Sequence, residues 1–287
     1  MPGNAQSNVQ DKVVVITGAT SGIGQVAAGE LAAGGARLVL VARDPARAEA
    51  TLALLRQRGP RQAHRAHVAD LSRLADIKRV GAEIAAAEPR IDVLINNAGN
   101  VFGTRALTDD GFERTFATNH VAYFVLTLLL RDRLIAAAPA RVVNTASGAH
   151  RFQALDFDDL QLAKGYRTMR AYGRSKLCNI LFTRELARRL AGNGVTANCL
   201  HPGFVATNLG QRSGGVFGGL VRLAMMFGTR PERGAATIVY LASSPEVAEI
   251  SGGYFVDCRP ATPSSQAQDD ASAARLWSET ARLTGIG

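Results

Sequence analysis

Tyr172 and Lys176 stand four residues apart in a stretch whose apolar residues recur at helical spacing. A separation of four places the two side chains on one face of a helix, one turn apart. An ammonium close to a phenol favours the phenolate and lowers the pKa of the tyrosine from its usual value of about 10. The pair is suited to exchanging a proton with the oxygen of an alcohol or a carbonyl, although the same spacing is common on helix surfaces without such a role.

A serine ends one of the expected strands. The strand around 142–143 runs into Asn144-Thr145-Ala146-Ser147, and the strand at 93–95 is closed by Asn96-Asn97-Ala98-Gly99. The carboxyl ends of parallel strands face the ligand crevice of such a sheet, so Ser147 is expected to donate a hydrogen bond to a carbonyl oxygen. Ser147 does not resemble a hydrolase nucleophile, because the two glycines that flank the serine of a nucleophile elbow are missing.

A glycine-rich loop, Thr17-Gly18-Ala19-Thr20-Ser21-Gly22-Ile23-Gly24, lies where the first expected strand turns into the first helix. Glycines let the backbone turn sharply and approach a ligand, and the start of a helix offers unpaired N–H groups. This combination suits a pyrophosphate. A glycine-rich turn that holds no ligand is the alternative, and the order of strand, loop and helix disfavours it.

The end of the second strand decides which dinucleotide such a loop would hold. An acidic residue there would accept from the ribose 2′-hydroxyl, but this chain has Ala42 followed by Arg43. A guanidinium binds a 2′-phosphate, so the sequence favours NADP(H) over NAD(H), unless Arg43 pairs with Asp44 or faces solvent. After the third strand, Asp70 is expected to accept from the adenine amino group or else to cap a helix that begins near Ser72.

Strands and helices alternate along the whole chain. The strands are expected at 13–16, 38–41, 66–68, 93–95, 142–143, 195–200 and 254–256, and helices at 45–58 and 72–87 lie between them. The strands are apolar at consecutive positions, as expected when helices cover both faces of a parallel sheet. We therefore predict an α/β fold of Rossmann type: one domain over 11–287, after a flexible tail at 1–10, with a doubly wound parallel sheet of about seven strands.

The composition excludes several other classes of protein. With 287 residues, 47% of them hydrophobic and 20% charged, the chain is neither disordered nor a disulfide-stapled miniprotein. The net charge of +9 is spread without a basic stripe interleaved with aromatic residues, so no nucleic-acid partner is predicted. The sequence starts without a signal-peptide pattern, and its longest apolar run, 121–130, is about half of what a membrane span needs, so we expect a cytoplasmic protein.

The motifs together resemble those of the short-chain dehydrogenase/reductase family. They occur in family order from about Asp11 to Asp257: TGxxxGxG in the first loop, NNAG after the fourth strand, then Ser147, YxxxK and His201-Pro202-Gly203. The resemblance implies a catalytic tetrad of Asn119, Ser147, Tyr172 and Lys176. It further implies that Asn119 organises a proton-relay water and that Lys176 binds the nicotinamide ribose.

The resemblance extends to the cofactor site and to one branch of the family. The implied cofactor-binding residues are Gly18, Thr20, Ser21, Gly22, Ile23, Gly24, Arg43, Asp70, Leu71, Asn97, Ala98, Gly99, Tyr172, Lys176, Pro202, Gly203, Val205 and Thr207, the last two at the carboxamide. Ser147 and Tyr172 lie 25 positions apart, about twice the spacing of most members, and the run 175–186 follows. In both respects the chain is similar to the retinol dehydrogenase-like branch, which is often NADP(H)-dependent.

Two segments depart from the alternation of strands and helices. Residues 203–229 are apolar and glycine-rich, which indicates a flexible lid over a dry site, and 259–268 is expected to be a connector to a last helix at 270–283. The expected walls of the substrate pocket are His150, Phe152, Tyr166, Phe204, Leu209 and Phe217. These residues would instead pack on the sheet or on a second subunit if there is no such pocket, and the stretch 215–228 could lie on a membrane surface.

The sequence thus predicts an NADP(H)-dependent oxidoreductase that interconverts an alcohol and its carbonyl by hydride transfer, on a small lipophilic substrate and without a metal. A non-catalytic NADP(H)-binding sensor is the alternative, and an epimerase or dehydratase fits the glycine spacing poorly. The helices around 121–130 and 180–190 carry more apolar surface than one sheet face requires. This surplus, together with the family's habit, predicts a homodimer or homotetramer.

Overall fold

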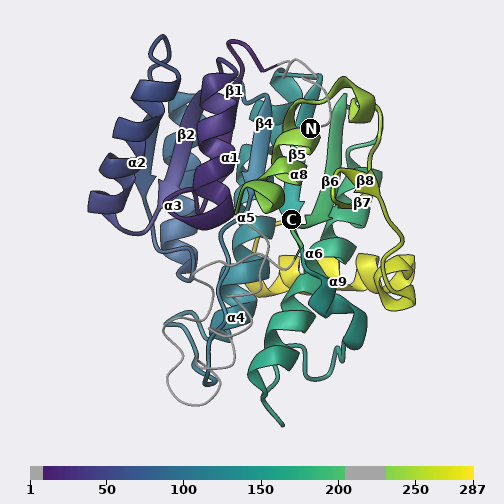
Figure 1. Ribbon diagram of the computed structural model, residues 1–287. Helices are drawn as coiled ribbons and strands as arrows, with labels where there is room; N and C mark the ends of the chain where they lie inside the picture. The colour runs from purple at the N-terminus through teal and green to yellow at the C-terminus, as the bar shows by residue number, and fades with distance from the viewer. Residues whose placement is uncertain (1–8, 204–230) are drawn as a thin grey trace.

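A central sheet organises the molecule. The computed structural model describes residues 9–203 and 231–287. The strands of these residues are β1 (Val13–Thr17), β2 (Arg37–Ala42), β3 (Arg65–Val68), β4 (Val93–Asn96), β5 (Ala140–Thr145), β6 (Val195–His201), β7 (Tyr254–Val256) and β8 (Arg259–Pro260). They form one eight-stranded sheet in the order β3-β2-β1-β4-β5-β6-β7-β8 (Figure 1). Seven strands run parallel, and β8 pairs antiparallel with β7.

Helices cover both faces of this sheet. They are α1 (Gly22–Ala33), α2 (Pro45–Arg58), α3 (Leu74–Ala87), α4 (Arg114–Phe116), α5 (Ala122–Ala136), α6 (Thr168–Arg189), α8 (Pro231–Ser243) and α9 (Asp270–Thr284). Four shorter turns are the π-helix η1 (Ala117–Val121) and the 3-10 turns η2 (Gly148–Phe152), η3 (Pro245–Val247) and η4 (Ser265–Gln268). One apolar cluster joins the sheet to α1, α2 and α8, and the other joins it to α3, α5, α6 and α9.

Strand β1 shows why the strands are continuously apolar. Successive side chains of a strand point to opposite faces of the sheet. Val14 and Ile16 therefore enter the cluster with α1, while Val13 and Val15 enter the cluster with α5, and all four are buried. This two-sided burial confirms the predicted doubly wound α/β fold of Rossmann type.

Two expected boundaries differ from those of the structure. The predicted connector 259–268 contains β8 and η4, because a two-residue strand is too short to leave a periodic signal. The helix expected from Ser72 begins at Leu74, because Asp70 first makes a separate turn by accepting from the N–H of Ser72 at 3.0 Å. Helix α2 matches its predicted bounds, and Asp44 caps it by accepting from the N–H groups of Ala46 and Arg47.

Helix α9 covers the outer surface of α5 and α6. Figure 1 shows α9 (yellow) crossing α6 (teal). The ring of Trp277 lies 4.9 Å from the ring of Phe124 on α5 and 5.8 Å from that of Phe182 on α6, centroid to centroid. Leu276 and Ala273 are buried beside it. Part of the apolar surface from which the sequence predicts self-association is therefore covered within one chain.

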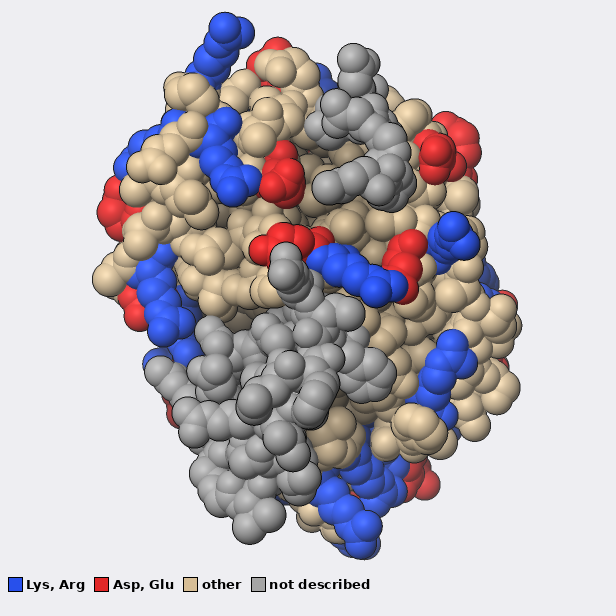
Figure 2. All heavy atoms as spheres, in the orientation of Figure 1, with Lys and Arg blue, Asp and Glu red and all other residues tan. Residues whose placement is uncertain are grey.

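The predicted lid, from residue 204 onward, lies outside the described residues, as do Phe204, Val205, Thr207, Leu209, Phe217 and the stretch 215–228. Within 9–203 and 231–287, none of the helices has the length and apolar character needed to cross a bilayer. On the face drawn in Figure 2, basic side chains lie in separate places with acidic ones among them, so no continuous basic stripe is visible there.

Candidate active site

Tyr172 and Lys176 lie in the first turns of α6, which begins at Thr168 after an extended Arg167. The Nζ atom of Lys176 is 5.7 Å from the centre of the Tyr172 ring, so the two side chains share a face as the spacing predicts. The same Nζ atom donates a hydrogen bond of 3.0 Å to the carbonyl oxygen of Thr145, at the end of β5. Helix α6 therefore delivers both side chains to the carboxyl edge of the sheet.

Lys176 is only 3% exposed. Burial lowers its pKa to about 7, because a charge is poorly solvated away from water. The ring of Tyr123 on α5, also buried, lies 5.7 Å from Nζ, close enough for a cation–π attraction. Near neutral pH the site therefore holds a lysine that gains or loses its proton readily.

The pKa of Tyr172 corrects one expectation. Burial raises this pKa above its usual value, and a hydrogen bond with Ser147 acts in the opposite direction without reversing the shift. The sequence led us to expect that Lys176 lowers the pKa of Tyr172. Burial outweighs that attraction because it disfavours the phenolate and, in the same place, lowers the pKa of Lys176 to about 7, so that only part of its positive charge is present at neutral pH.

Ser147 follows β5 in extended conformation and caps η2, where its hydroxyl accepts from the N–H of Ala149 at 3.3 Å. The hydroxyl is also in contact with Tyr172. The structure therefore brings Ser147, Tyr172 and Lys176 together, where β5 ends and α6 begins, as the motifs predict. A hydroxyl and a phenol side by side are able to hold one substrate oxygen between them.

Asn119 lies in the π-helix η1, directly before α5. Its side chain donates to the carbonyl oxygen of Asn100 and to the hydroxyl of Ser175, each at 3.0 Å, and accepts from the N–H of Asn100 at 2.8 Å. Single π-turns are rare and frequently mark functional sites. The amide of Asn119 thus joins the segment after β4 to α6, beside Lys176.

The glycine loop and the NNAG segment are in close contact. Gly18 and Gly22 have φ angles of +70° and +55°, which favour glycine. A Cβ atom on Gly18 would lie 2.7 Å from the Cα of Ala98, and one on Gly24 would lie 2.4 Å from the amide nitrogen of Asn97. Neither position tolerates a side chain, so glycine is required for this approach.

The start of α1 fits a pyrophosphate. Ser21 precedes it in extended conformation without a side-chain hydrogen bond to its first turn, and that turn has no acidic residue. Its N–H groups and the positive end of the helix dipole are therefore available to an anion. Lys176, which donates to Thr145, keeps further N–H groups for a ribose. These donors fit a dinucleotide, with Gly22, Ile23 and Lys176 among the residues that would hold it.

Arg43 is exposed directly after β2. The alternative partner considered for it, Asp44, is occupied by capping α2 and lies 4.0 Å from Arg47. Within the described part of the chain Arg43 takes part in none of the ion pairs. Its guanidinium is thus available to an external anion.

Asp70 is not the N-cap of α3, since that position belongs to Arg73. Its carboxylate accepts from the N–H and hydroxyl of Ser72, at 3.0 and 2.8 Å, and its own N–H donates to Asp76. Leu71 next to it is buried. Pro202 and Gly203 follow β6 and are partly buried, with Gly203 at φ +81°.

The three described residues of the predicted substrate wall have different surroundings. His150 is fully buried, with both ring nitrogens in hydrogen bonds. Tyr166 donates from its hydroxyl to the carbonyl oxygen of Phe102 at 3.0 Å. Phe152 is 86% exposed. Both ring nitrogens of His150 thus serve internal structural contacts.

The sequence did not indicate a buried amide network beneath the site. Asn96 donates to Asn144 and to Thr127, and Asn144 donates to Thr183, each at 2.9 Å. Asn179 donates to the carbonyl oxygen of Thr145, which also accepts from Lys176. These bonds tie β4 and β5 to α5 and α6. The sequence signal for this network was an asparagine near the end of β4 and of β5, since a fully buried strand is otherwise apolar.

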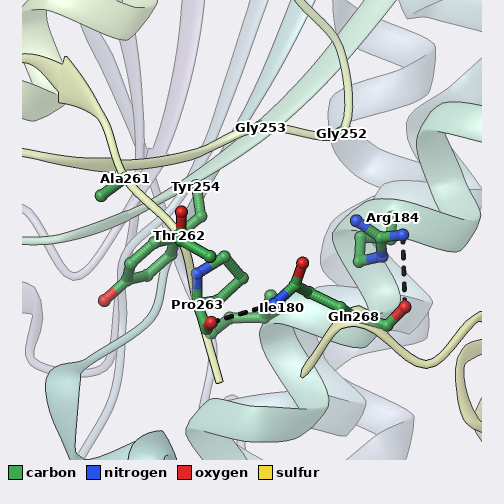
Figure 3. Close-up of a pocket in the computed structure, with 9 residues that line it drawn as sticks. All are labelled: Ile180, Arg184, Gly252, Gly253, Tyr254, Ala261, Thr262, Pro263 and Gln268. Atoms are coloured by element: carbon green, nitrogen blue, oxygen red, sulfur yellow. Dashed lines mark hydrogen bonds between the residues drawn. The ribbon is translucent and has the colours of Figure 1, made fainter. Parts of the chain in front are cut away.

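A cavity of about 220 Å³ lies farther along α6 (Figure 3). It is lined by Ile180 and Arg184 on α6, by 252–254 at the start of β7, and by 261–263 and Gln268. None of Asn119, Ser147, Tyr172 and Lys176 lines it. Figure 3 shows the segment after β8 lying along α6 here, with a carbonyl of Gln268 hydrogen-bonded to Arg184.

The comparisons with known proteins agree with this arrangement. Residues 12–214 match a family described as short chain dehydrogenase. Retinol dehydrogenase 13 from Homo sapiens is 41% identical over 289 residues, covering 98% of this chain and 87% of that protein. A crystal structure of an uncharacterized protein from Mycobacterium paratuberculosis has a TM-score of 0.78 and 32% identity, covering 98% of this chain and 96% of that one. The RhlG/NADP active-site complex from Pseudomonas aeruginosa has a TM-score of 0.70 and 28% identity, covering 88% and 96%.

Proposed function

Because the chain belongs to the short-chain dehydrogenase family and is therefore an oxidoreductase of CH–OH groups, we propose that it uses NADP(H) to interconvert a lipophilic alcohol and its carbonyl. One observation carries the proposal: Ser147, Tyr172 and Lys176 converge at the carboxyl edge of the sheet, with Asn119 beside them. A bound nicotinamide cofactor supplies or accepts the hydride.

The residues of the chain divide the remaining work. In reduction, Ser147 donates a hydrogen bond to the substrate oxygen and Tyr172 gives it a proton. The raised pKa of Tyr172 keeps this phenol protonated at neutral pH, as a proton donor requires. Lys176 holds the ribose, and its ammonium helps to bear the negative charge that Tyr172 acquires on giving up its proton. In oxidation, the same groups act in reverse.

The preference for NADP(H) is supported by Arg43, exposed after β2 and without an ion pair among the described residues. A related protein is described with NADP at its active site. We expect wild type to bind NADPH more tightly than NADH by at least about tenfold, since a charge-assisted hydrogen bond contributes about 1.5–3 kcal/mol. Arg43→Asp should abolish this preference, as measured by nicotinamide fluorescence titration. Arg47→Asp, one turn into α2, is the matched control, and an equal preference in all three proteins would exclude Arg43.

The lipophilic substrate is supported by the relatives, which are retinol dehydrogenases. The test is a panel of aldehydes and ketones of increasing chain length and ring number. Turnover of each is monitored as the decrease in the absorbance of NADPH. Turnover should rise with the apolar area of the substrate. Faster turnover of small polar carbonyls would contradict this substrate class. Tight NADPH binding without turnover of any carbonyl would favour a non-catalytic sensor.

A further inference from the structure

Residues 259–284, which we call the C-terminal segment, comprise β8, η4 and α9. The segment lies along α6, as Figures 1 and 3 show. Two of its residues, Ser264 and Thr280, make hydrogen bonds to buried imidazoles. Each imidazole belongs to a short turn that also holds a residue of the catalytic tetrad: His150 lies in η2, which Ser147 caps, and His120 follows Asn119 in η1.

The first imidazole, His150, has its proton placed by its partners. Its Nε2 atom accepts from the backbone N–H of Ser264 at 3.1 Å, so that nitrogen carries no proton. The proton is then on Nδ1, which donates to the carbonyl oxygen of Ser147 at 2.6 Å. One neutral ring therefore connects the peptide of Ser147 to the peptide of Ser264.

The surroundings of His150 keep it neutral and fixed. The ring is fully buried and meets that of Tyr254 edge-on, with centroids 5.3 Å apart. Burial lowers the pKa of His150, against a backbone hydrogen bond to Ser147 that raises it. The neighbouring cation, Arg151, donates to the carbonyl oxygen of Thr262 at 2.7 Å and so fastens the same turn to the C-terminal segment a second time.

The second imidazole, His120, is equally enclosed. Its Nε2 atom lies 3.0 Å from the hydroxyl of Thr280 on α9. The rings of Phe116 and Phe182 surround it, with centroids 5.2 and 6.1 Å away. Burial lowers the pKa of His120 to about 3, so the ring is neutral at physiological pH. Asn119, its neighbour in the same π-turn, holds Asn100 and Ser175.

We propose that the C-terminal segment positions the catalytic centre: Ser264 holds Ser147 through His150, and Thr280 holds the turn of Asn119 through His120. This inference rests on the proposed function and deepens it. His150 and His120 are positioning residues, since each acts through another residue. Because displacements of about 1 Å at a reacting centre reduce rates up to about a hundredfold, loss of either link should lower kcat while cofactor binding is kept.

Ser264 offers a substitution that breaks the first link. Its φ of −63° is that of proline, so Ser264→Pro is compatible with the backbone at this residue. It deletes the N–H that reaches His150 and puts the proline Cδ in its place, which crowds Nε2 and displaces the imidazole. Ser264→Ala is the matched control, because the hydroxyl of Ser264 is buried without a hydrogen-bond partner among the described residues. We expect Ser264→Pro to lower kcat about tenfold with KM for NADPH within about twofold, and Ser264→Ala to match wild type.

Thr280 tests the second link. Thr280→Val removes the hydroxyl with almost no change of shape, whereas Thr280→Ser retains it. We expect the valine variant to lower kcat several-fold, the serine variant to recover it, and both to keep KM for NADPH. Assays run well below the melting temperature of each variant. If Ser264→Pro fails to fold, Thr280→Val alone decides whether the segment positions the centre.

A second readout separates this inference from the proposed function. The hydrogen bond from Ser147 lowers the pKa of Tyr172, so displacement of Ser147 in Ser264→Pro should raise that pKa. NMR titration of ¹³Cζ-labelled tyrosine measures it without turnover. Wild-type protein without NADPH-dependent turnover would contradict the proposed function, while the titration still tests the link. Unchanged kcat and unchanged Tyr172 pKa in both Ser264→Pro and Thr280→Val would overturn the inference.

Discussion

Tyr172 is the residue on which the proton transfer depends. Tyr172→Phe keeps the ring that packs beside Lys176 and removes the hydroxyl. We expect turnover to fall by about 10² to 10⁴, because that is what general acid catalysis contributes, while NADPH still binds. Steady-state turnover and fluorescence titration measure the two effects. Tyr166→Phe is the matched control, since the hydroxyl of Tyr166 donates to Phe102 outside the tetrad. Near-normal turnover of Tyr172→Phe would remove this residue from the mechanism.

The buried Lys176 lowers the free energy of unfolding of the protein. Its pKa is about 7 in the folded protein against a usual 10.5, so between these values the unfolded chain binds more protons than the native one. Stability therefore rises with pH from about 7 to about 10 and is lowest below 7. Lys176→Met should lose turnover but unfold at a higher urea concentration. We expect its free energy of unfolding to exceed that of wild type by about 1–4 kcal/mol at pH 7, and this gain to shrink toward pH 10. A gain that does not depend on pH would contradict this.

Residue types and spacing were enough to single out Ser147, Tyr172 and Lys176, and the family resemblance added Asn119, but neither indicated the residues that support them. Tyr172 and Lys176 are one helical turn apart, and Ser147 ends a strand, so local rules place them. The partners of His150 and His120 lie 114 and 160 positions away in sequence. No local pattern links such residues, and for this reason the sequence assigned His150 to a substrate wall.

At the scale of elements, the sequence predicted α9 as a helix but not the surface that it covers. Its bounds were close to those predicted, since Asp269 caps it and Gly285 ends it in left-handed conformation. What it covers could not be read from its own residues, because α5 and α6 also present apolar residues that a partner subunit would bury equally well. The short strand β8 was missed for lack of length.

Substitution of Trp277 tests how much α9 contributes to the stability of the protein. It packs on Phe124 and Phe182, and the guanidinium of Arg189 lies 4.3 Å from its ring centre. Trp277→Ala should destabilise the protein by about 3–5 kcal/mol and expose apolar surface on α5 and α6. Thermal denaturation and size-exclusion chromatography measure the two effects. Trp277→Phe, which keeps an aromatic ring, should lose less. Unchanged stability in Trp277→Ala would show that α9 is dispensable for this surface.

At the scale of the whole molecule, buried histidines make the fold sensitive to acid. Burial lowers the pKa of His64, His120, His150 and His201, that of His120 to about 3. Below about pH 6.5 the unfolded chain binds protons that the native protein does not bind. The free energy of unfolding therefore decreases as the pH is lowered, by up to about 1.4 kcal/mol per pH unit for each such histidine. Urea unfolding between pH 7 and pH 4.5 should show a falling midpoint, less steep in His120→Gln. A constant midpoint would contradict it.

The position of α9 in the chain also matters while the protein is being made. Ribosomes add about 5–20 residues per second, and α9 follows α6 by about a hundred residues, so the faces of α5 and α6 stay bare for about 5–20 seconds. A growing chain in that interval is open to aggregation or to capture by a chaperone. Ribosome-bound chains stalled before residue 270 should therefore crosslink to chaperones, and chains stalled well beyond residue 284 should not.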